Sequence, residues 1–232
     1  MSAVVVFDLD GTLVDSAAAI RDIANIQMAE LGLAPLDLAE SRGYIGNGAP
    51  TFLQRALRAR GVEDEDLFAA RLHRFEELYA TAPGEANTPF PGVDRAMRDL
   101  ISAGNALALC TNKPTLPTEA VLAAHRWSDL FAAIVTGDTL AERKPHPAPL
   151  LEAARRAGGG SVVYVGDSEV DAATAKAAGI PLLLYAHGYS KVPPSQLPHA
   201  AIFADFAEVP ALVSAHARPL SAALTSSRSA SA

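Results

Sequence analysis

Short, mostly apolar runs recur along the chain, and helical patterns separate most of them. The runs are Val4–Phe7, Ala106–Cys110, Ala133–Thr136, Val162–Val165 and Leu182–Tyr185. Continuous apolar strands that alternate with helices are typical of a parallel sheet that is covered by helices on both faces. We therefore predict an α/β fold with a Rossmann-like, three-layer core built around a parallel sheet.

The alternation is interrupted after the first run, where several helical segments follow one another. A block of helices inserted after the first strand indicates a separate small unit. We predict a core formed by residues 1–15 and 90–214 and a helical cap formed by residues 16–89. The segment Thr88–Gly92 contains two prolines and is the expected stiff hinge between them.

One inserted segment carries an apolar stripe. Its members, spaced four, three and four residues apart, are Phe68, Leu72, Phe75 and Tyr79. This spacing places them on one face of a helix. Such a stripe is usually part of a hydrophobic core, so we assign these side chains to packing inside the cap and not to ligand binding.

Composition excludes several classes of protein. Of the 232 residues, 50% are hydrophobic and 19% are charged, which is typical of a globular chain. The net charge of -7 disfavours a nucleic-acid partner. No run approaches the roughly 20 apolar residues of a membrane span, and the chain starts without a basic targeting segment. We therefore expect a cytoplasmic protein with no membrane partner.

The carboxyl-terminal end and the assembly state are less constrained by the sequence. Residues 215–232 are rich in Ser and Ala, and we expect them to form a mobile tail. No feature identifies an interface, so monomer and homodimer both remain open.

Two carboxylates follow the first apolar run. Asp8 and Asp10 lie two residues apart, and side chains at that spacing share a face of an extended chain, so both can converge on one ligand. Ligands in open α/β sheets bind beyond the carboxyl ends of strands. The alternative is that the segment before Gly11 is only a tight turn. Polar residues beyond the later runs favour a reactive site.

Further polar side chains follow later runs. Thr111, Asn112 and Lys113 come directly after a predicted strand and offer a hydroxyl and backbone amides to phosphoryl oxygens. Lys144 opens a Lys-Pro-His-Pro segment, in which the prolines fix the backbone around a cation that can neutralise phosphate. Taken alone, Lys144 also fits a solvated loop lysine.

A second acidic pair follows the run that ends at Val165. Asp167 comes first, and Asp171 lies one helical turn further on. Mg²⁺ prefers hard oxygen ligands and is commonly held by one or two carboxylates together with water and phosphate. We predict Asp167 as a direct Mg²⁺ ligand and Asp171 as a ligand through water. The alternative for Asp171 is an acidic residue that complements the macrodipole at a helix start.

Together these residues meet the needs of phosphate-ester cleavage, which are a nucleophile, a proton donor, charge neutralisation and usually a divalent metal. Asp8 can form an aspartyl-phosphate. Asp10 can protonate the leaving oxygen and then activate water. Thr111 and Lys144 can bind the phosphoryl oxygens, and Mg²⁺ is the expected cofactor.

In four ordered motifs the chain resembles the haloacid dehalogenase superfamily of phosphohydrolases. Within residues 3–213, the motifs are Asp8–Ser16, Cys110–Asn112, Arg143–Pro147 and Val165–Asp171. The resemblance implies Asp8 as the nucleophile and Asp10 as the general acid and base. It implies Thr111 and Lys144 as phosphate-binding residues. It also implies Mg²⁺ held by Asp8, Asp167 and the backbone oxygen of Asp10, and a cap inserted after the first strand.

Within the superfamily, the segments Asp10–Thr12, Thr111–Lys113 and Tyr44–Gly48 look like those of phosphoglycolate phosphatases. In the last segment, Asn47 and Gly48 can bring backbone amides onto a small anionic substrate, although a solvated turn is the alternative. Lys113 can meet a second negative group such as a carboxylate.

The substrate expected from this resemblance is a small phosphorylated metabolite, 2-phosphoglycolate. The sequence leaves open a sugar phosphomutase and a phosphatase of a nucleotide, pyrophosphate or sugar phosphate. It also leaves open a catalytically silent domain that binds a phosphometabolite.

Overall fold

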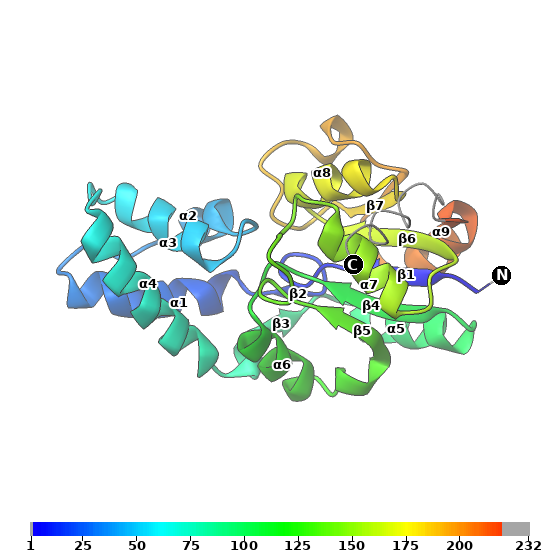
Figure 1. Ribbon diagram of the computed structural model, residues 1–232, viewed down its shortest axis with the longest axis horizontal. Helices are drawn as coiled ribbons and strands as arrows, with labels where there is room; N and C mark the ends of the chain where they lie inside the picture. The colour runs from blue at the N-terminus through cyan, green and yellow to red at the C-terminus, as the bar shows by residue number, and fades with distance from the viewer. Residues whose placement is uncertain (1, 220–232) are drawn as a thin grey trace, which may run out of the picture.

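The computed structural model describes residues 2–219 and has a largely parallel sheet at its centre (Figure 1). The strands are β1 (Val4–Phe7), β4 (Ala106–Cys110), β5 (Phe131–Val135), β6 (Ser161–Gly166), β7 (Leu182–Tyr185), β8 (Ala201–Phe203) and β9 (Arg218–Pro219). They follow the order β5-β4-β1-β6-β7-β8, and each neighbouring pair in that order is parallel. Strand β9 pairs antiparallel with the start of β6. The predicted α/β fold is confirmed.

Helices cover both faces of the sheet. They are α5 (Val93–Ser102), α6 (Thr115–Ala124), α7 (Ala148–Arg156), α8 (Glu169–Ala178) and α9 (Val209–His216). Alternate residues of a strand point to opposite faces. Val5 and Phe7 of β1 therefore pack with α5, α6 and α9, while Val4 and Val6 pack with α7 and α8. Because both faces are buried, the central strands appear in the sequence as continuous apolar runs.

The observed strands differ from the predicted ones mainly at the edges of the sheet. Strand β5 begins at Phe131 and ends at Val135, whereas the apolar run predicted a strand over Ala133–Thr136. Strands β8 and β9 were not predicted. Strand β8 has only three residues, Ala201–Phe203, and they are apolar, but a run this short does not by itself indicate a strand.

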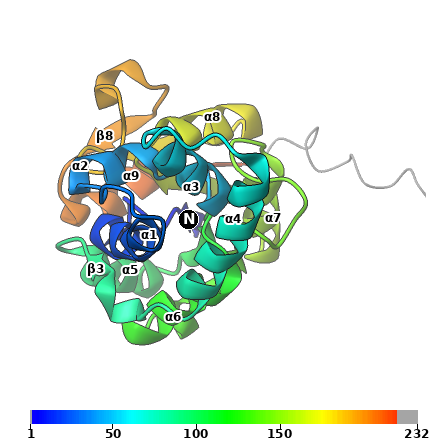
Figure 2. The same cartoon turned by 90° about the vertical axis from the view of Figure 1, so that its left-hand side faces the viewer.

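Four helices form a second unit beyond the carboxyl ends of the strands, and we call this unit the helical cap (Figures 1 and 2). They are α1 (Ala17–Glu30), α2 (Leu38–Tyr44), α3 (Ala49–Arg58) and α4 (Glu65–Ala80). The cap encloses its own hydrophobic cluster, in which Phe52 and Phe75 have ring centroids 5.8 Å apart. Side chains of Asp37 and Asp64 cap the starts of α2 and α4.

The chain enters and leaves the cap through two adjacent segments. The short strands β2 (Val14–Asp15) and β3 (Thr88–Pro89) pair antiparallel with each other. Asp15 also forms an ion pair of 2.8 Å with Arg42 of α2. The hydroxyl of Tyr189, in the loop after β7, donates to Asp15 Oδ1 at 2.6 Å and accepts from the backbone N–H of Ser16 at 2.7 Å. The loop after β7 therefore holds the entrance of the cap through Tyr189.

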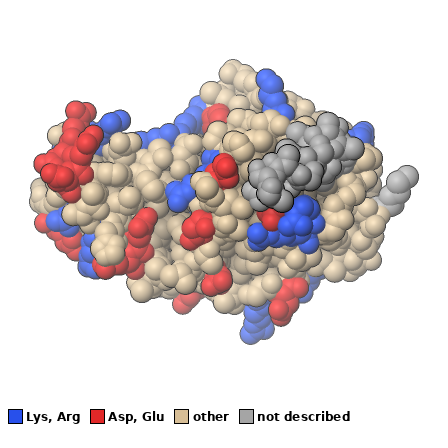
Figure 3. Space-filling model, viewed as in Figure 1, with Lys and Arg blue, Asp and Glu red and all other residues tan. Residues whose placement is uncertain are grey.

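Acidic side chains gather at the end of the cap where α3 meets α4 (Figure 3). Residues 63–66, in that connection and the start of α4, are all acidic and exposed. Over the described residues 2–219, no helix is both long enough and apolar enough to cross a membrane.

Regular structure continues into the segment predicted as a tail. Ala215 and His216 belong to α9, and β9 pairs with β6 after them. Residues 220–232, the rest of the predicted tail, lie outside the described residues.

Two leucines that differ in burial should differ in their contribution to the free energy of unfolding. Leu100 of α5 is fully buried in the sheet cluster, whereas Leu116 of α6 is 60% exposed. We expect Leu100→Ala to lower the free energy of unfolding by about 2–5 kcal/mol, because it removes buried methyl groups and leaves a cavity. The matched change Leu116→Ala should alter it by less than about 0.5 kcal/mol. Urea denaturation followed by circular dichroism measures both, and equal losses would contradict the assigned core.

Candidate active site

The carboxyl ends of three neighbouring strands meet at one edge of the sheet. Asp8 follows β1, Thr111 follows β4 and Asp167 follows β6. The chain after Asp8 turns sharply, with Gly11 at a φ of 89°, and the backbone N–H of Thr12 donates to the Leu9 carbonyl at 3.2 Å. The segment is therefore a tight turn, and this turn also brings the carboxylates to the strand ends.

Lys144 lies between two buried carboxylates. Its Nζ is 2.8 Å from Asp8 Oδ1 and 2.8 Å from Asp171 Oδ1. It also donates to the Tyr164 hydroxyl at 2.9 Å, and that hydroxyl donates to Asp171 Oδ1 at 2.6 Å. Burial acts against the charge of Lys144, but the two carboxylates hold its pKa above the ordinary value. Lys144 is thus a fixed cation beside Asp8 and not a solvated loop lysine.

The carboxylates of this cluster carry more buried negative charge than Lys144 neutralises. Burial raises the pKa of Asp8 to about 7, against the attraction of Lys144. Burial, with Asp171 and Asp8 nearby, also raises the pKa of Asp167 well above its usual range. At Asp171 the effect of burial is outweighed by Lys144 and by hydrogen bonds, so its pKa is lowered.

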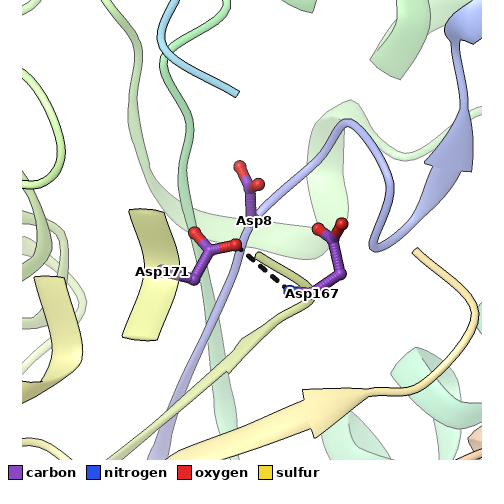
Figure 4. A group of neighbouring side chains, drawn as sticks. All are labelled: Asp8, Asp167 and Asp171. Atoms are coloured by element: carbon purple, nitrogen blue, oxygen red, sulfur yellow. Dashed lines mark hydrogen bonds between the residues drawn. The ribbon is translucent and has the colours of Figure 1, made fainter. Parts of the chain in front are cut away.

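Three carboxylates can share a metal ion. Asp8, Asp167 and Asp171 each offer an oxygen, and these oxygens lie within 4.8 Å of one another (Figure 4). Clustered carboxylate oxygens with excess negative charge are the donor set that a hard divalent cation prefers. The residues present therefore fit a divalent metal.

Asp167 is held in one orientation. The Thr12 hydroxyl donates to its Oδ1 at 2.7 Å, and the backbone N–H of Tyr189 donates to its Oδ2 at 2.6 Å. A Cβ atom at Gly11 or Gly188 would lie 2.5 or 2.3 Å from Asp167 Oδ2, so only glycine lets the main chain approach this carboxylate so closely. Partners that orient a metal-binding carboxylate are a usual part of such sites.

Asp171 uses both of its oxygens within the protein. Besides the contacts of Oδ1, its Oδ2 accepts from the Ser168 hydroxyl at 2.6 Å and from the backbone N–H of Asp167 at 3.1 Å. Ser168 and Asp171 form the capping box that begins α8. The helix-start alternative for Asp171 is thus part of the structure, and its contact with metal through water stays a prediction.

Asp10 faces a second lysine. Lys113 Nζ donates to Asp10 Oδ1 at 2.9 Å and to the Tyr79 hydroxyl of α4 at 2.7 Å. The Lys113 side chain is fully buried, and Nζ lies 4.8 Å from the centre of the Tyr79 ring. This contact joins the core to the cap beside the carboxylate that we assign as acid and base.

A cavity that is partly open to solvent lies between the strand ends and the cap, and the empty space in and around it measures about 450 Å³. On the core side it is lined by Asp8, Asp10, Thr111, Asn112, Lys113, Pro114 and Lys144. On the cap side it is lined by Ile20, Ile45, Gly46, Gly48, Ala49, Phe52, Phe75 and Tyr79. The cavity is polar at the strand ends and largely apolar under the cap.

The predicted cap-loop residues divide between two positions. Gly48 lines the cavity, whereas Asn47 is not among its lining residues and accepts from Arg55 through its Oδ1 at 3.0 Å. Asn112 ties the loops together, because its amide donates to the Gly46 carbonyl at 3.1 Å and to the Lys144 carbonyl at 2.9 Å. The substrate-binding roles of Asn47 and Asn112 stay predictions.

Several residues at the site could not be found from sequence patterns. Phe75 and Tyr79 pack in the cap cluster as predicted, and both also line the cavity, which their spacing in the sequence does not indicate. Tyr164 lies in an apolar run that indicates only a strand. Tyr189 lies in a loop without a motif, and no sequence signal connects it with Asp167.

Comparison with known proteins identifies the family of the chain. A family model described as haloacid dehalogenase-like hydrolase matches residues 3–179. A phosphoglycolate phosphatase of Cereibacter sphaeroides (strain ATCC 17025 / ATH 2.4.3) is 47% identical over 210 residues, which is 90% of this chain and 96% of that protein. One of Rhodobacter capsulatus is 41% identical, over 92% of this chain and 97% of that protein.

Solved structures show the same fold. The crystal structure of a predicted phosphoglycolate phosphatase from Haemophilus somnus 129PT has a TM-score of 0.81 at 29% identity, covering 91% of this chain and 98% of that one. CbbY from Rhodobacter sphaeroides, crystallised with phosphate, has a TM-score of 0.74 at 26% identity, covering 90% and 96%. The resemblance predicted from four motifs is confirmed, and the chain belongs to the haloacid dehalogenase-like hydrolases.

Proposed function

We propose that this protein is a Mg²⁺-dependent phosphomonoesterase and that its substrate is 2-phosphoglycolate. The observation that carries the chemistry is the buried Asp8, which lies on the cavity with Lys144 on one side and the carboxylate cluster on the other. Relatives named phosphoglycolate phosphatase, which match over nearly their whole length, support the substrate.

The proposed reaction begins with the phosphoryl group at the polar end of the cavity. Lys144 and the Thr111 hydroxyl bind its oxygens, and the cation neutralises charge where the phosphoryl group is transferred. Asp8 attacks phosphorus, a bond forms between its carboxylate oxygen and phosphorus, and the ester P–O bond breaks. Asp10 gives its proton to the leaving alkoxide, which departs as glycolate.

The second half of the reaction regenerates the enzyme. Asp10, now a carboxylate, takes a proton from water, and the resulting hydroxide attacks phosphorus of the aspartyl-phosphate. Inorganic phosphate leaves and the Asp8 carboxylate returns. The cap limits access of bulk water to the cavity, so that hydrolysis follows transfer instead of competing with it.

Mg²⁺ fits beside Asp8. Asp8, Asp167 and the backbone oxygen of Asp10 would hold it, with Asp171 acting through water. When bound, the ion neutralises charge on the phosphoryl oxygens and on the carboxylate cluster.

The lining of the cavity supports a small substrate over a sugar phosphate. A sugar presents several hydroxyls, and each one needs a hydrogen-bond partner once it leaves water. Among the cap residues that line the cavity, Tyr79 is the one with a polar side-chain group. A two-carbon acid has a single further anionic group, so it needs fewer hydrogen-bond partners from the cap than a sugar does.

Replacing Asp8 tests the assigned nucleophile. We expect Asp8→Asn to lower kcat for 2-phosphoglycolate by more than about a thousandfold, because an amide cannot form the acyl phosphate. Release of inorganic phosphate measures turnover, and circular dichroism confirms that the variant folds. Retention of more than a tenth of the activity in a folded variant would remove Asp8 from this role.

Two variants of equally buried threonines test the dependence of activity on the metal. We expect EDTA to stop phosphate release and added Mg²⁺ to restore it. Thr12→Val removes the hydroxyl that orients Asp167, so the Mg²⁺ concentration for half-maximal activity should rise by roughly 10- to 100-fold. Thr174→Val is the control, since Thr174 is equally buried but bonds the Val170 carbonyl within α8. Equal effects of the two changes would argue against a metal at Asp167.

A panel of esters separates the proposed substrate from its rivals. We expect kcat/KM to be highest for 2-phosphoglycolate when it is compared with a pyrimidine nucleotide, pyrophosphate and glucose phosphates. A higher value for one of the others would keep the chemistry and replace the substrate. Conversion of a sugar phosphate to its isomer, with little phosphate released, would identify a mutase instead.

A further inference from the structure

The contact between Lys113 and Tyr79 is built from two sides of the cavity. Lys113 belongs to the loop after β4, and Tyr79 belongs to α4 of the cap. Both side chains are buried, and both residues line the cavity. The contact is therefore present only when the cap lies over the strand ends.

The cap offers little else to a polar ligand. Its other lining side chains are aliphatic or aromatic hydrocarbon, and its two glycines contribute only main chain. The part of a substrate that extends from the phosphoryl group toward the cap therefore meets one polar side-chain group of the cap, the hydroxyl of Tyr79. That hydroxyl lies 2.7 Å from Lys113 Nζ.

Both groups have donors to spare. An ammonium has three N–H donors, and Lys113 uses one on Asp10 and one on Tyr79. The Tyr79 oxygen accepts a hydrogen bond from Lys113. Within residues 2–219, the proton of the Tyr79 hydroxyl has no hydrogen-bond acceptor. Burial, with Asp10 nearby, raises the pKa of Tyr79 well above its usual range, so the hydroxyl keeps that proton. A cation and a neutral O–H, side by side, suit a carboxylate.

Asp10 shows that a carboxyl oxygen can occupy this place. Its Oδ1 accepts from Lys113 Nζ at 2.9 Å. A second carboxylate brought by the substrate would bind the same ammonium from the cap side, where the Tyr79 hydroxyl supplies a second donor. Hydrogen bonds to a charged partner are the stronger class in proteins.

We propose that Tyr79 is a specificity-determining residue, which together with Lys113 binds the substrate's carboxylate and so makes closure of the cap depend on that group. The inference rests on the proposed function, because it names the cap residue that reads the non-phosphoryl end of the substrate. It extends the predicted role of Lys113 to a group on the opposite side of the cavity.

The experiment compares two esters that differ in one group. Ethyl phosphate has a methyl where 2-phosphoglycolate has its carboxylate. For Tyr79→Phe, we expect kcat/KM for 2-phosphoglycolate to fall roughly 10- to 100-fold, as for loss of one hydrogen bond to a charged group, and kcat/KM for ethyl phosphate to change less than about twofold. Tyr44→Phe is the matched control, since Tyr44 is on the cap but does not line the cavity.

A double-variant cycle tests whether the two residues act on the same group. Lys113→Met should also reduce the preference for 2-phosphoglycolate over ethyl phosphate. If Tyr79 and Lys113 share the carboxylate, the loss of preference in the double variant will be smaller than the product of the two single losses. Losses that multiply would overturn the shared subsite.

The failures of the two proposals are distinguishable. If wild type prefers 2-phosphoglycolate and Tyr79→Phe loses activity equally on both esters, or loses none, the phosphatase assignment stands and the role of Tyr79 is overturned. If wild type cleaves ethyl phosphate as well as 2-phosphoglycolate, both the substrate and the subsite are overturned while the chemistry remains.

Binding gives a readout without turnover. In the Asp8→Asn background with Mg²⁺, calorimetry with 2-phosphoglycolate should show a Kd that rises at least about tenfold when Tyr79→Phe is added. The Kd for ethyl phosphate should stay unchanged. An unchanged Kd for 2-phosphoglycolate would overturn the subsite even if no ester were hydrolysed.

Discussion

The buried ion pair between Lys144 and Asp8 is the interaction on which the site depends. A buried charge without a partner is strongly unfavourable, and removing one member of such a pair commonly costs about 3–5 kcal/mol. The Lys144 side chain is 2% exposed and is held by Asp171 and Tyr164 as well as by Asp8. Since Asp8 follows β1, Tyr164 lies in β6 and Asp171 lies in α8, the pair forms only when these elements are in register. The fold and the reactive group are thus fixed together.

The parallel sheet explains how a few residues that are distant in the sequence can form one site. Parallel strands deliver their carboxyl ends to one edge, so Asp8, Thr111 and Asp167 converge although they are far apart in the sequence. The cap then closes the edge with a mostly apolar surface. In the proposed function, the chemistry lies on the core, and we infer that discrimination between substrates depends on the few polar groups that the cap supplies.

Much of this arrangement could be predicted from the sequence, because it depends on local patterns. Apolar runs revealed the buried central strands, and the polar residues directly after them revealed the strand-end site. Strand β8 was not predicted, because three apolar residues are too short a run to indicate a strand. The same limit applies to the site. Thr12, Tyr164 and Tyr189 contact Asp167 or Lys144 across the fold, and such contacts leave no periodic trace in the sequence.

Tyr79 makes a contact that its spacing in the sequence does not indicate. Its spacing from Phe68, Leu72 and Phe75 places it correctly on the packed face of α4, and its ring does pack there. The hydroxyl at the tip of that ring reaches Lys113, which is a property of the docked cap and not of the helix. An amphipathic side chain can serve both purposes, and only the tertiary structure reveals the second.

In the proposed reaction, Asp8 itself accepts the phosphoryl group. The most direct measurement is to quench the enzyme during turnover of 2-phosphoglycolate, reduce any acyl phosphate with borohydride and locate the modified residue by peptide mass spectrometry. We predict conversion of Asp8 to homoserine, dependent on substrate. Modification at Asp10 instead, or steady turnover with no modified residue, would contradict the account.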